Sequence, residues 1–300
     1  MAEAAASAAP AAHRTIGHER TPTQIFLREF RRNRGAVVGT VLFAILILLV
    51  IFAPYVTRFD PVEPNYAARF SPPTAEHWFG TDRNGRDIFT RVVYGGRISL
   101  LVGVVAVAIG SILGTVFGLI SGFYGGVIDN ALMRFMDFVL AMPGILLAIT
   151  IVFALGPSLV NVMIAVGFST MPQYARVVRA SVLSAKQLPY VEAARAAGAG
   201  DGAVMGRHIL PNVFAPVLVL ATLGLGSAVL SVAALSFLGL GAAPPTPEWG
   251  LLISDGRGVL RRSWWVATFP GLAIMVTVLA VNLIGDGLRD ALDPRLRGQV

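Results

Sequence analysis

Six apolar stretches, each close to the length that crosses a lipid bilayer, constrain the fold of this chain more than any other feature. A helix needs about 20 residues to cross about 30 Å of hydrocarbon. The sequence therefore predicts an all-α integral membrane protein whose six transmembrane helices lie at 35–54, 98–120, 138–155, 159–174, 213–240 and 266–284. Composition agrees, because 55% of the residues are hydrophobic and only 14% are charged, whereas soluble domains carry about a quarter charged residues.

The segment before the first span divides into two parts. Residues 1–20 are rich in alanine and hold no apolar run long enough for a signal peptide, so we expect a flexible cytoplasmic tail. A transit peptide is the alternative, because arginine and serine are present. Residues 21–34 place Phe26 and Phe30 one helical turn apart, opposite three arginines, which predicts an interfacial helix lying on the membrane surface.

Arginine placement gives an expected orientation. An even number of spans places both termini on one side of the membrane. If that side is the cytoplasm, fifteen of the 24 Lys and Arg residues lie inside and nine outside, as the positive-inside rule requires. In this orientation, residues 55–97 form an outer loop that contains an amphipathic lead-in helix. Residues 98–288 form a five-helix core, which includes a cytoplasmic loop at 176–212 and an outer loop at 242–265. Residues 289–300 form a cytoplasmic tail.

The second span carries four glycines at four-residue spacing, which places them on one face of the helix. They are Gly110, Gly114, Gly118 and Gly122. Such a ridge predicts close packing against another helix, with a hinge as the alternative. Asp137, near the start of the third span, is expected either to line a polar pathway or to pair with Arg134, one turn earlier.

The sequence contains no recognisable reaction centre. It lacks the HExxH and GxSxG motifs, a Walker A phosphate loop and any paired carboxylate in an apolar stretch. Its only lysine, Lys186, follows Ser-Ala rather than a glycine-rich loop, and it has no cysteine for disulfides or metal sites. We therefore expect no enzymatic activity and no cofactor or metal in this chain. Nucleic acid is not an expected partner, because the basic residues form no patch.

The most informative segment lies between the fourth and fifth spans. Its pattern is Tyr-Val-Glu-Ala-Ala-Arg-Ala-Ala-Gly at 190–198, then nine residues, then His-Ile-Leu-Pro at 208–211. Pro189 suits the first turn of a helix, Gly198 suits the left-handed position after its end, and Asp201 is expected to cap a second helix. The pattern predicts a compact helical knob whose alanine surface another protein can contact. An ordinary alanine-rich surface helix is the alternative.

This spacing resembles the EAA loop of ABC importer permeases, in which a coupling helix docks into the ATPase subunits. The resemblance implies that the ATPase-coupling residues are Tyr190, Glu192, Ala193, Ala194, Arg195, Ala197, Gly198, Asp201, His208 and Pro211. Many importers have isoleucine where this chain has His208, and the variant Arg-His-Ile-Leu-Pro-Asn at 207–212 resembles the peptide and nickel branch. A channel or an ion-coupled carrier, which needs no ATPase, is the competing class.

Further motifs extend the resemblance over 21–297, to the second permease subunit of bacterial dipeptide and oligopeptide importers. They include His-Trp-Phe-Gly-Thr-Asp-Arg-Asn-Gly-Arg-Asp at 77–87 and Leu-Ser-Phe-Leu-Gly-Leu-Gly at 235–241, with others at 30–39, 244–250 and 285–294. The resemblance implies an inner-membrane permease that forms half of a dipeptide pathway. Its implied partners are a homologous permease, two ATPases that bind ATP and Mg²⁺, and an extracytoplasmic binding protein. Importers of glutathione, oligopeptides or nickel are the alternatives, and the stretch at 263–271 is closer to the dipeptide members.

The two outer loops carry expectations of their own. Residues 80–97 mix charged and apolar side chains, which predicts a helix at the outer interface that leads into the second span or docks a binding protein. In the second loop, prolines add stiffness, and Trp249, Trp264 and Trp265 are expected at the level of the lipid headgroups. By the resemblance, the outer mouth or a binding-protein contact includes Pro245, Pro247, Glu248 and Trp249.

Overall fold

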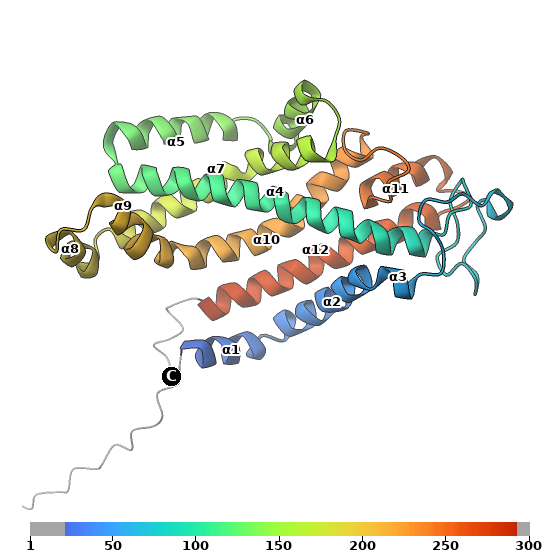
Figure 1. Cartoon of the computed structure of the whole chain (residues 1–300), viewed down its shortest axis with the longest axis horizontal. Coiled ribbons are helices and arrows are strands. Elements are labelled where there is room, and N and C mark those ends of the chain that lie inside the picture. The colour runs from blue at the N-terminus through green and yellow to red at the C-terminus, as the bar shows by residue number, and fades with distance from the viewer. Residues whose placement is uncertain (1–21, 293–300) are drawn as a thin grey trace, which may run out of the picture.

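The computed structural model describes residues 22–292, and the predicted tail at 1–20 lies outside them. Within the described residues the regular structure is helical, apart from one isolated β-bridge between Thr81 and Asp87. Five long helices run lengthwise through the molecule (Figure 1): α2 (Arg34–Ile51), α4 (Ile88–Tyr124), α7 (Leu159–Ala185), α10 (Leu210–Phe237) and α12 (Trp265–Leu292).

Shorter helices lie at the ends and along one side of the long ones. They are α1 (Pro22–Arg32), α3 (Ala53–Val56), α5 (Gly126–Leu140), α6 (Gly144–Leu155), α8 (Pro189–Ala196), α9 (Asp201–Ala203) and α11 (Trp249–Gly256). A π-helical turn, Val204–Ile209, joins α9 to α10, and two short 3₁₀ turns cover Tyr66–Ala68 and Arg257–Val259.

Among the described residues, four helices are long and apolar enough to cross a membrane: α2, α4, the continuous helix Asp201–Phe237, and α12. The pair α5 and α6 adds a fifth if it forms one broken span, because its two helices meet at 90°. The third span predicted at 138–155 is therefore not one straight helix. Pro143, just before α6, has no amide hydrogen to continue the α5 hydrogen-bond ladder.

Further predicted boundaries differ from the structure. The fourth span, predicted at 159–174, is the 27-residue helix α7, which continues to Ala185 and so includes the first residues of the predicted cytoplasmic loop. The separate lead-in helix and the second span form a single helix, α4, whose 37 residues extend about 56 Å at 1.5 Å per residue. It begins after Asp87, whose carboxylate accepts a hydrogen bond of 2.8 Å from the Thr90 amide and so caps the helix. At the other end of the chain, α12 continues to Leu292 and so includes the first residues of the predicted tail.

Among the described helices, α4 and α7 share the most extensive contact. The four glycines of the ridge are all buried at this contact. A Cβ atom added to any of them would lie closer than 3.0 Å to atoms of α7, and for Gly110, Gly114 and Gly118 these include backbone atoms. The glycine face therefore brings two helix backbones together, and any larger residue there would push α7 away.

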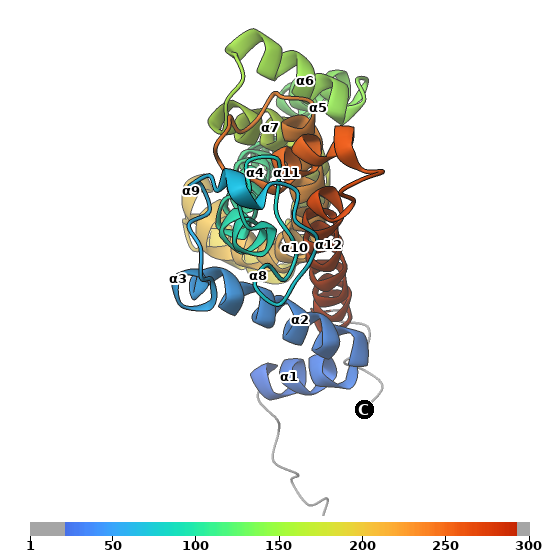
Figure 2. The ribbon, with the colours of Figure 1, turned by 90° about the vertical axis from the view of Figure 1, so that its right-hand side faces the viewer.

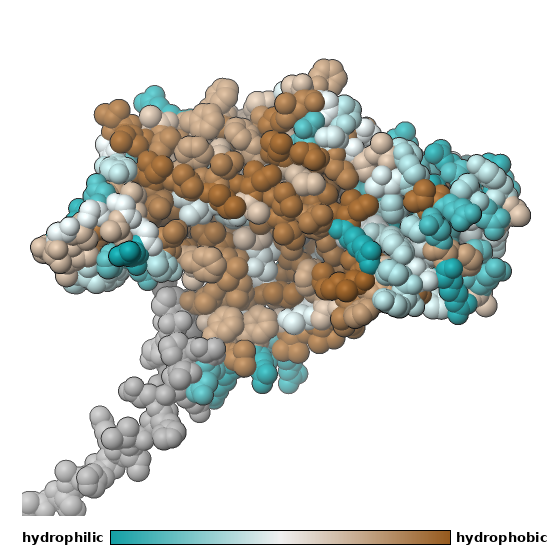
Figure 3. All heavy atoms as spheres, in the orientation of Figure 1, coloured by the Kyte–Doolittle hydropathy of each residue, from teal (hydrophilic) through white to brown (hydrophobic). Residues whose placement is uncertain are grey.

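The surface has an apolar middle and two more hydrophilic ends (Figure 3). At one end lie α8, α9, the start of α2 and the last turns of α12 (Figure 1). A hydrogen bond of 2.9 Å from Asn33 Nδ2 to Asp290 Oδ2 joins the start of α2 to α12 there. The other end, which faces the viewer in Figure 2, holds α3, the 57–87 loop and α11. We call the end that holds α8 and α9 the knob end, and the end that holds α3 and α11 the opposite end.

Candidate functional site

Residues 189–211, which we call the knob, project from the knob end. Pro189 is the first residue of α8, a position where the missing amide hydrogen is not needed. After the helix, Gly198 has the left-handed φ of +85° that the sequence predicts. Its amide bonds the Arg195 carbonyl at 2.9 Å and the Ala199 amide bonds the Ala194 carbonyl at 3.0 Å, which closes the helix C-terminus.

The predicted cap of the second helix is wrong by one residue. Gly200 occupies the N-cap position of α9, and Asp201 is the first helical residue, with no side-chain capping bond. From there the helix passes through the π-helical turn directly into α10. The knob is therefore the beginning of a long helix rather than an isolated loop.

The inner face of the knob shares one hydrophobic core with the long helices. Its buried members are Val191 of α8 and Val204 and Ile209 of the π-helical turn. They pack with Phe123 of α4, Val213 of α10 and several buried residues of α7. A displacement of the knob is thus transmitted to three long helices, since close-packed interiors resist compression.

Two cations lie against the Phe123 ring, one from the knob and one from the residues just before it. The Arg195 guanidinium lies 5.1 Å from the centre of the Phe123 ring, and the Lys186 ammonium lies 5.8 Å from it. Lys186 Nζ also donates a hydrogen bond of 2.6 Å to the Phe123 carbonyl. Glu192 and Arg195 form no ion pair within residues 22–292, so Glu192 keeps an exposed carboxylate without a cationic partner in this part of the chain.

A second set of contacts ties α8 to α10 across the π-helical turn. Asn212 Nδ2 donates to Tyr190 Oη at 2.7 Å and to the His208 carbonyl at 2.9 Å. Tyr190 Oη in turn donates to the same carbonyl at 3.3 Å. Asn212 was not among the coupling residues that the resemblance implied. The sequence could have indicated it, because Asn212 directly follows the closing His-Ile-Leu-Pro group.

The ten coupling residues named from the sequence all lie in this one unit. Those exposed on its surface are Tyr190, Glu192, Ala193, Arg195, Ala197, Gly198, Asp201 and Pro211. Ala194 and His208 are half-buried. The outer surface of the knob has only short side chains at its centre, because the central residues are alanine and glycine. A partner can therefore approach the backbone closely.

Two ion pairs join α5 to α7. Arg179 Nε and Nη2 each lie 2.6 Å from an oxygen of Asp129, and Arg176 Nη2 lies 2.7 Å from Asp137 Oδ1. The pairing of Asp137 with Arg134 expected from the sequence is therefore wrong. The tertiary fold brings α7 alongside α5, which offers Asp137 an arginine from a segment 39 residues away.

The opposite end carries a buried charge cluster that the sequence had placed at the membrane interface. Asp82 Oδ2 lies 2.7 Å from Arg86 Nε and 2.7 Å from Arg91 Nη1. Their exposed fractions are 2%, 4% and 1%. The predicted amphipathic helix over 80–97 is thus corrected, because these charges pair with each other inside the protein.

The residues proposed for an outer mouth or a binding-protein contact lie mostly inside as well. Pro245 is exposed, whereas Pro247, Glu248 and Trp249 are buried, so those three offer no surface to a partner of this chain. Glu248 caps α11 by accepting hydrogen bonds from the amides of Gly250 and Leu251, at 3.0 and 2.9 Å. Burial raises the pKa of the Glu248 carboxyl.

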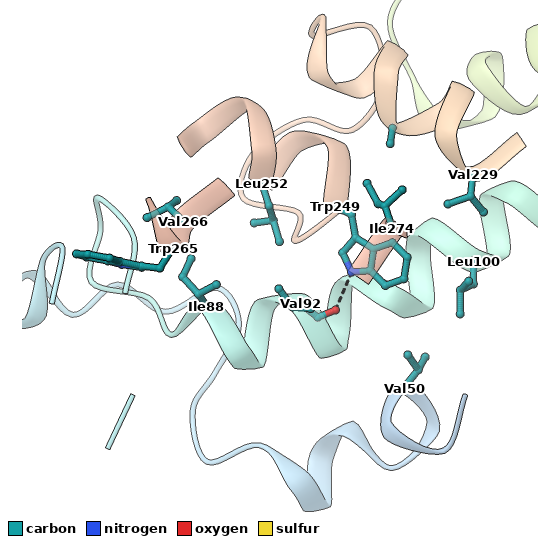
Figure 4. Close-up of a cluster of buried hydrophobic side chains, with 11 residues drawn as sticks. Val50, Ile88, Val92, Leu100, Val229, Trp249, Leu252, Trp265, Val266 and Ile274 are labelled. Carbon is teal, nitrogen blue, oxygen red and sulfur yellow. Dashed lines mark hydrogen bonds between the residues drawn. The ribbon is translucent and has the colours of Figure 1, made fainter. Parts of the chain in front are cut away.

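Tryptophan anchoring at headgroup level is corrected for two of the three residues. Trp249 lies in a hydrophobic cluster with Val92, Leu252 and Ile274, and its indole nitrogen donates to the Val92 carbonyl at 2.8 Å (Figure 4). Trp265 is buried too and donates to the Thr81 carbonyl at 3.1 Å. Only Trp264 of the three is exposed, at 51%.

Comparison with known proteins identifies the family. Residues 114–298 match the family described as "binding-protein-dependent transport system inner membrane component". The chain belongs to this family. Residues 21–73 of the permease also match the "N-terminal TM domain of oligopeptide transport permease C", so it is a C-type permease of the dipeptide and oligopeptide group of ABC importers.

Several relatives resemble this permease over nearly their whole length. It is 49% identical to the dipeptide transport system permease protein DppC of Alkalihalophilus pseudofirmus, over 92% of this chain and 91% of the relative. It is 45% identical to the protein of the same name from Haemophilus influenzae, over 93% and 96%. It is 46% identical to the glutathione transport system permease protein GsiD of Escherichia coli, over 93% and 92%.

A solved structure supports the permease fold. The structure titled "crystal structure of an amino acid ABC transporter with histidines" superposes with a TM-score of 0.51, covering 66% of this chain and 92% of that one. At 16% sequence identity the likeness concerns the fold alone. A multi-pass inner-membrane protein follows from the family and from the apolar helices.

Proposed function

We propose that this permease is one of two membrane subunits of an ATP-driven dipeptide importer, and that the knob is its contact with an ATPase subunit. The observation that carries the proposal is the two-sided construction of the knob. Its outer face is an exposed alanine surface, and its inner face shares a core with α4, α7 and α10. A partner that pushes on the exposed face would move three long helices together. The names of the dipeptide-transport relatives support the cargo.

Coupling requires that the knob distinguish two states of the ATPase, because a contact equally good in both would shift no equilibrium. Glu192 is suited to this task, since its carboxylate is exposed and can pair with a cation that one ATPase state presents. Arg195 would carry the resulting displacement to Phe123, over whose ring it lies. The helices would then alternate between inward-open and outward-open arrangements.

We further propose six spans with both termini in the cytoplasm. The six are α2, α4, the broken pair of α5 and α6, α7, α10 and α12. The start of α2 and the end of α12 lie at the knob end, which fits an even number of crossings. The basic last turn of α1 and its stacked Phe26 and Phe30 rings, 6.1 Å apart, suit a helix lying at the cytoplasmic interface.

The proposed assembly contains a homologous second permease, two cytoplasmic ATPases and an extracytoplasmic binding protein. The family description, which names a binding-protein-dependent system, supports the last of these. ATP and Mg²⁺ would bind to the ATPases, and this chain would provide neither catalysis nor a cofactor. Among residues 22–292, no group of three or more His, Cys, Asp or Glu side chains is arranged to hold a metal ion.

The test uses charge reversal and bulk at the knob. Glu192→Arg and Gly198→Trp are expected to abolish ATP-dependent uptake of a labelled dipeptide into vesicles while the protein stays inserted. Glu63→Arg, at an exposed glutamate of the opposite end, is the matched control and should leave the dipeptide uptake unchanged. Normal uptake by the two knob variants would contradict the coupling assignment.

The same vesicles identify the cargo and the energy source. Competition by unlabelled dipeptides but not by glutathione or longer peptides would support a dipeptide importer. Competition mainly by glutathione would reassign the cargo, and uptake that persists without ATP would favour an ion-coupled carrier.

A further inference from the structure

A cavity of about 330 Å³ opens between α4, α6, α7 and α10. Small-molecule sites usually have volumes of about 300–1,000 Å³. Apolar residues of all four helices line part of the wall, and the polar part comes from two helices. The polar lining residues are Ser169, Thr170, Gln173 and Tyr174 of α7 and Ser227 and Ser231 of α10.

These polar residues follow the periodicity of their helices. Ser169 and Gln173 are four residues apart on α7, and Ser227 and Ser231 are four apart on α10, so each pair lies on one helical face. Gln173 and Ser227 are exposed in the single chain. A face with an amide and hydroxyl groups is costly against hydrocarbon, which favours a protein-lined or aqueous environment at this depth.

The hydrogen-bonding capacity of the cavity is largely unused. Within residues 22–292, the side chains of Gln173, Ser227 and Ser231 make no hydrogen bond. Ser169 donates its hydroxyl hydrogen to the Val166 carbonyl at 2.9 Å but retains lone pairs that can accept. The wall therefore offers both donors and acceptors to a bound molecule.

The lining carries no Asp, Glu, Lys, Arg or His residue. The nearest arginine along α7 is Arg176, which is already paired with Asp137. Tyr174 closes the wall toward α10, where a Cβ at Gly224 would lie 2.6 Å from the tyrosine oxygen. The lining of the cavity thus carries no charged side chain. Because residue 224 is glycine, the Tyr174 side chain has room to extend to α10.

We propose that this cavity is the chain's own binding site for the peptide in transit, and that it binds the peptide-bond amide and carbonyl groups without discriminating the charge of the side chains. The inference rests on the proposed import of peptides. Amide and hydroxyl groups match the donors and acceptors that every dipeptide shares, whereas selection by charge would need a charged partner in the wall. Dipeptides with acidic, neutral and basic side chains should therefore pass this subunit alike.

The test places one charge in the wall by the isosteric change Gln173→Glu. Vesicles with the full assembly and saturating binding protein would take up Ala-Glu and Ala-Lys, and the ratio of the two rates is the readout. The wild-type rates set the reference ratio. A carboxylate within a few ångströms of the substrate should lower the Ala-Glu to Ala-Lys ratio about tenfold. The ratio is internally controlled, because lower expression or weaker folding affects both peptides equally.

A second measurement does not depend on uptake. The chain contains no cysteine, so Ser227→Cys introduces its sole thiol. A saturating dipeptide should slow the labelling of this thiol by a small neutral reagent at least about threefold, since the ligand occupies the cavity. Thr222→Cys lies on α10 outside the lining and is the control, whose labelling should not change.

The outcomes separate the two proposals. A wild-type assembly that imports no peptide would defeat the proposed function itself. A wild-type assembly that imports both peptides, with an unchanged ratio in Gln173→Glu and no protection of Ser227→Cys, would overturn the cavity assignment alone.

Discussion

The acidic side chains of the knob lie on its surface, whereas the opposite end, besides its exposed charges, also holds acidic side chains in its interior. Glu192 and Asp201 of the knob are exposed and form no ion pair within the described residues. At the opposite end Asp82 is almost fully buried between two arginines, and Glu248 is fully buried at the start of α11. The same residue type thus has a surface role at one end and an internal role at the other.

The difference shows how one chain can combine a rigid end with an end that engages a partner. The buried carboxylates help to join segments far apart in the sequence. Glu248 accepts a hydrogen bond of 3.2 Å from the Ser99 hydroxyl of α4, and Asp82 binds Arg91, which also donates to the Pro245 carbonyl. An exposed charge contributes little to folding but remains available for binding. Substitutions at the opposite end should therefore affect stability first, and those at the knob should affect transport first.

The largest expected effect on stability is that of Asp82→Ala. It leaves Arg86 and Arg91 buried without their carboxylate, which should cost about 3–5 kcal/mol. The measurement is the midpoint of thermal unfolding of the purified protein. Asp201→Ala, the same change on the exposed knob, should alter stability by no more than about 0.5 kcal/mol. Equal shifts for the two variants would remove the contrast between the ends.

A smaller loss of stability is expected for Glu248→Ala. The variant removes both hydrogen bonds that cap α11, which is worth about 1–2 kcal/mol. Thermal unfolding again measures it, with Glu63→Ala as the exposed control. A change in transport without a loss of stability would indicate that Glu248 acts on the pathway rather than on the fold.

Tyr190→Phe sharpens the comparison at the knob. It removes the hydroxyl that forms hydrogen bonds with Asn212 and with the His208 carbonyl. The expected loss of stability is about 1 kcal/mol. The loss should be local, so hydrogen exchange of the α8 amides should accelerate about fivefold while exchange in α11 stays unchanged. Tyr55→Phe, at an 87% exposed tyrosine, is the control. Uniform acceleration over the whole chain would contradict a separately anchored knob.

The smallest expected effect is a pH dependence at the opposite end. Burial raises the folded-state pKa of Glu248 above its ordinary value of 4.5. The folded protein therefore binds this proton more tightly, so the stabilisation is complete below pH 4.5 and is lost as the pH rises through the raised pKa. Glu248→Gln should abolish this contribution, which the difference between the two stability curves against pH would measure. Parallel curves would show that Glu248 does not titrate in this range.

Local patterns predicted much of the knob and little of the opposite end. Pro189 and Gly198 act through their own backbone preferences, so the bounds of α8 could be predicted from neighbouring residues. The partners of Asp82 are also near in sequence, but those two arginines are in turn in contact with residues from a distant segment, Arg91 with Pro245 and Arg86 with Asp255. A mixed charged and apolar segment therefore looks amphipathic in sequence and lies inside in the fold.

The sequence by itself determined the helical membrane class, the glycine face of α4 and the start and end of α8, because these follow from apolar length, residue spacing and backbone preference. Only the tertiary structure decided the pairing of Asp137 with Arg176, the burial of Trp249 and Trp265, and the polar cavity between α7 and α10. Each of these joins residues from separate helices. Periodicity shows which face of a helix a residue occupies, but the neighbour that this face meets depends on how all the helices pack together.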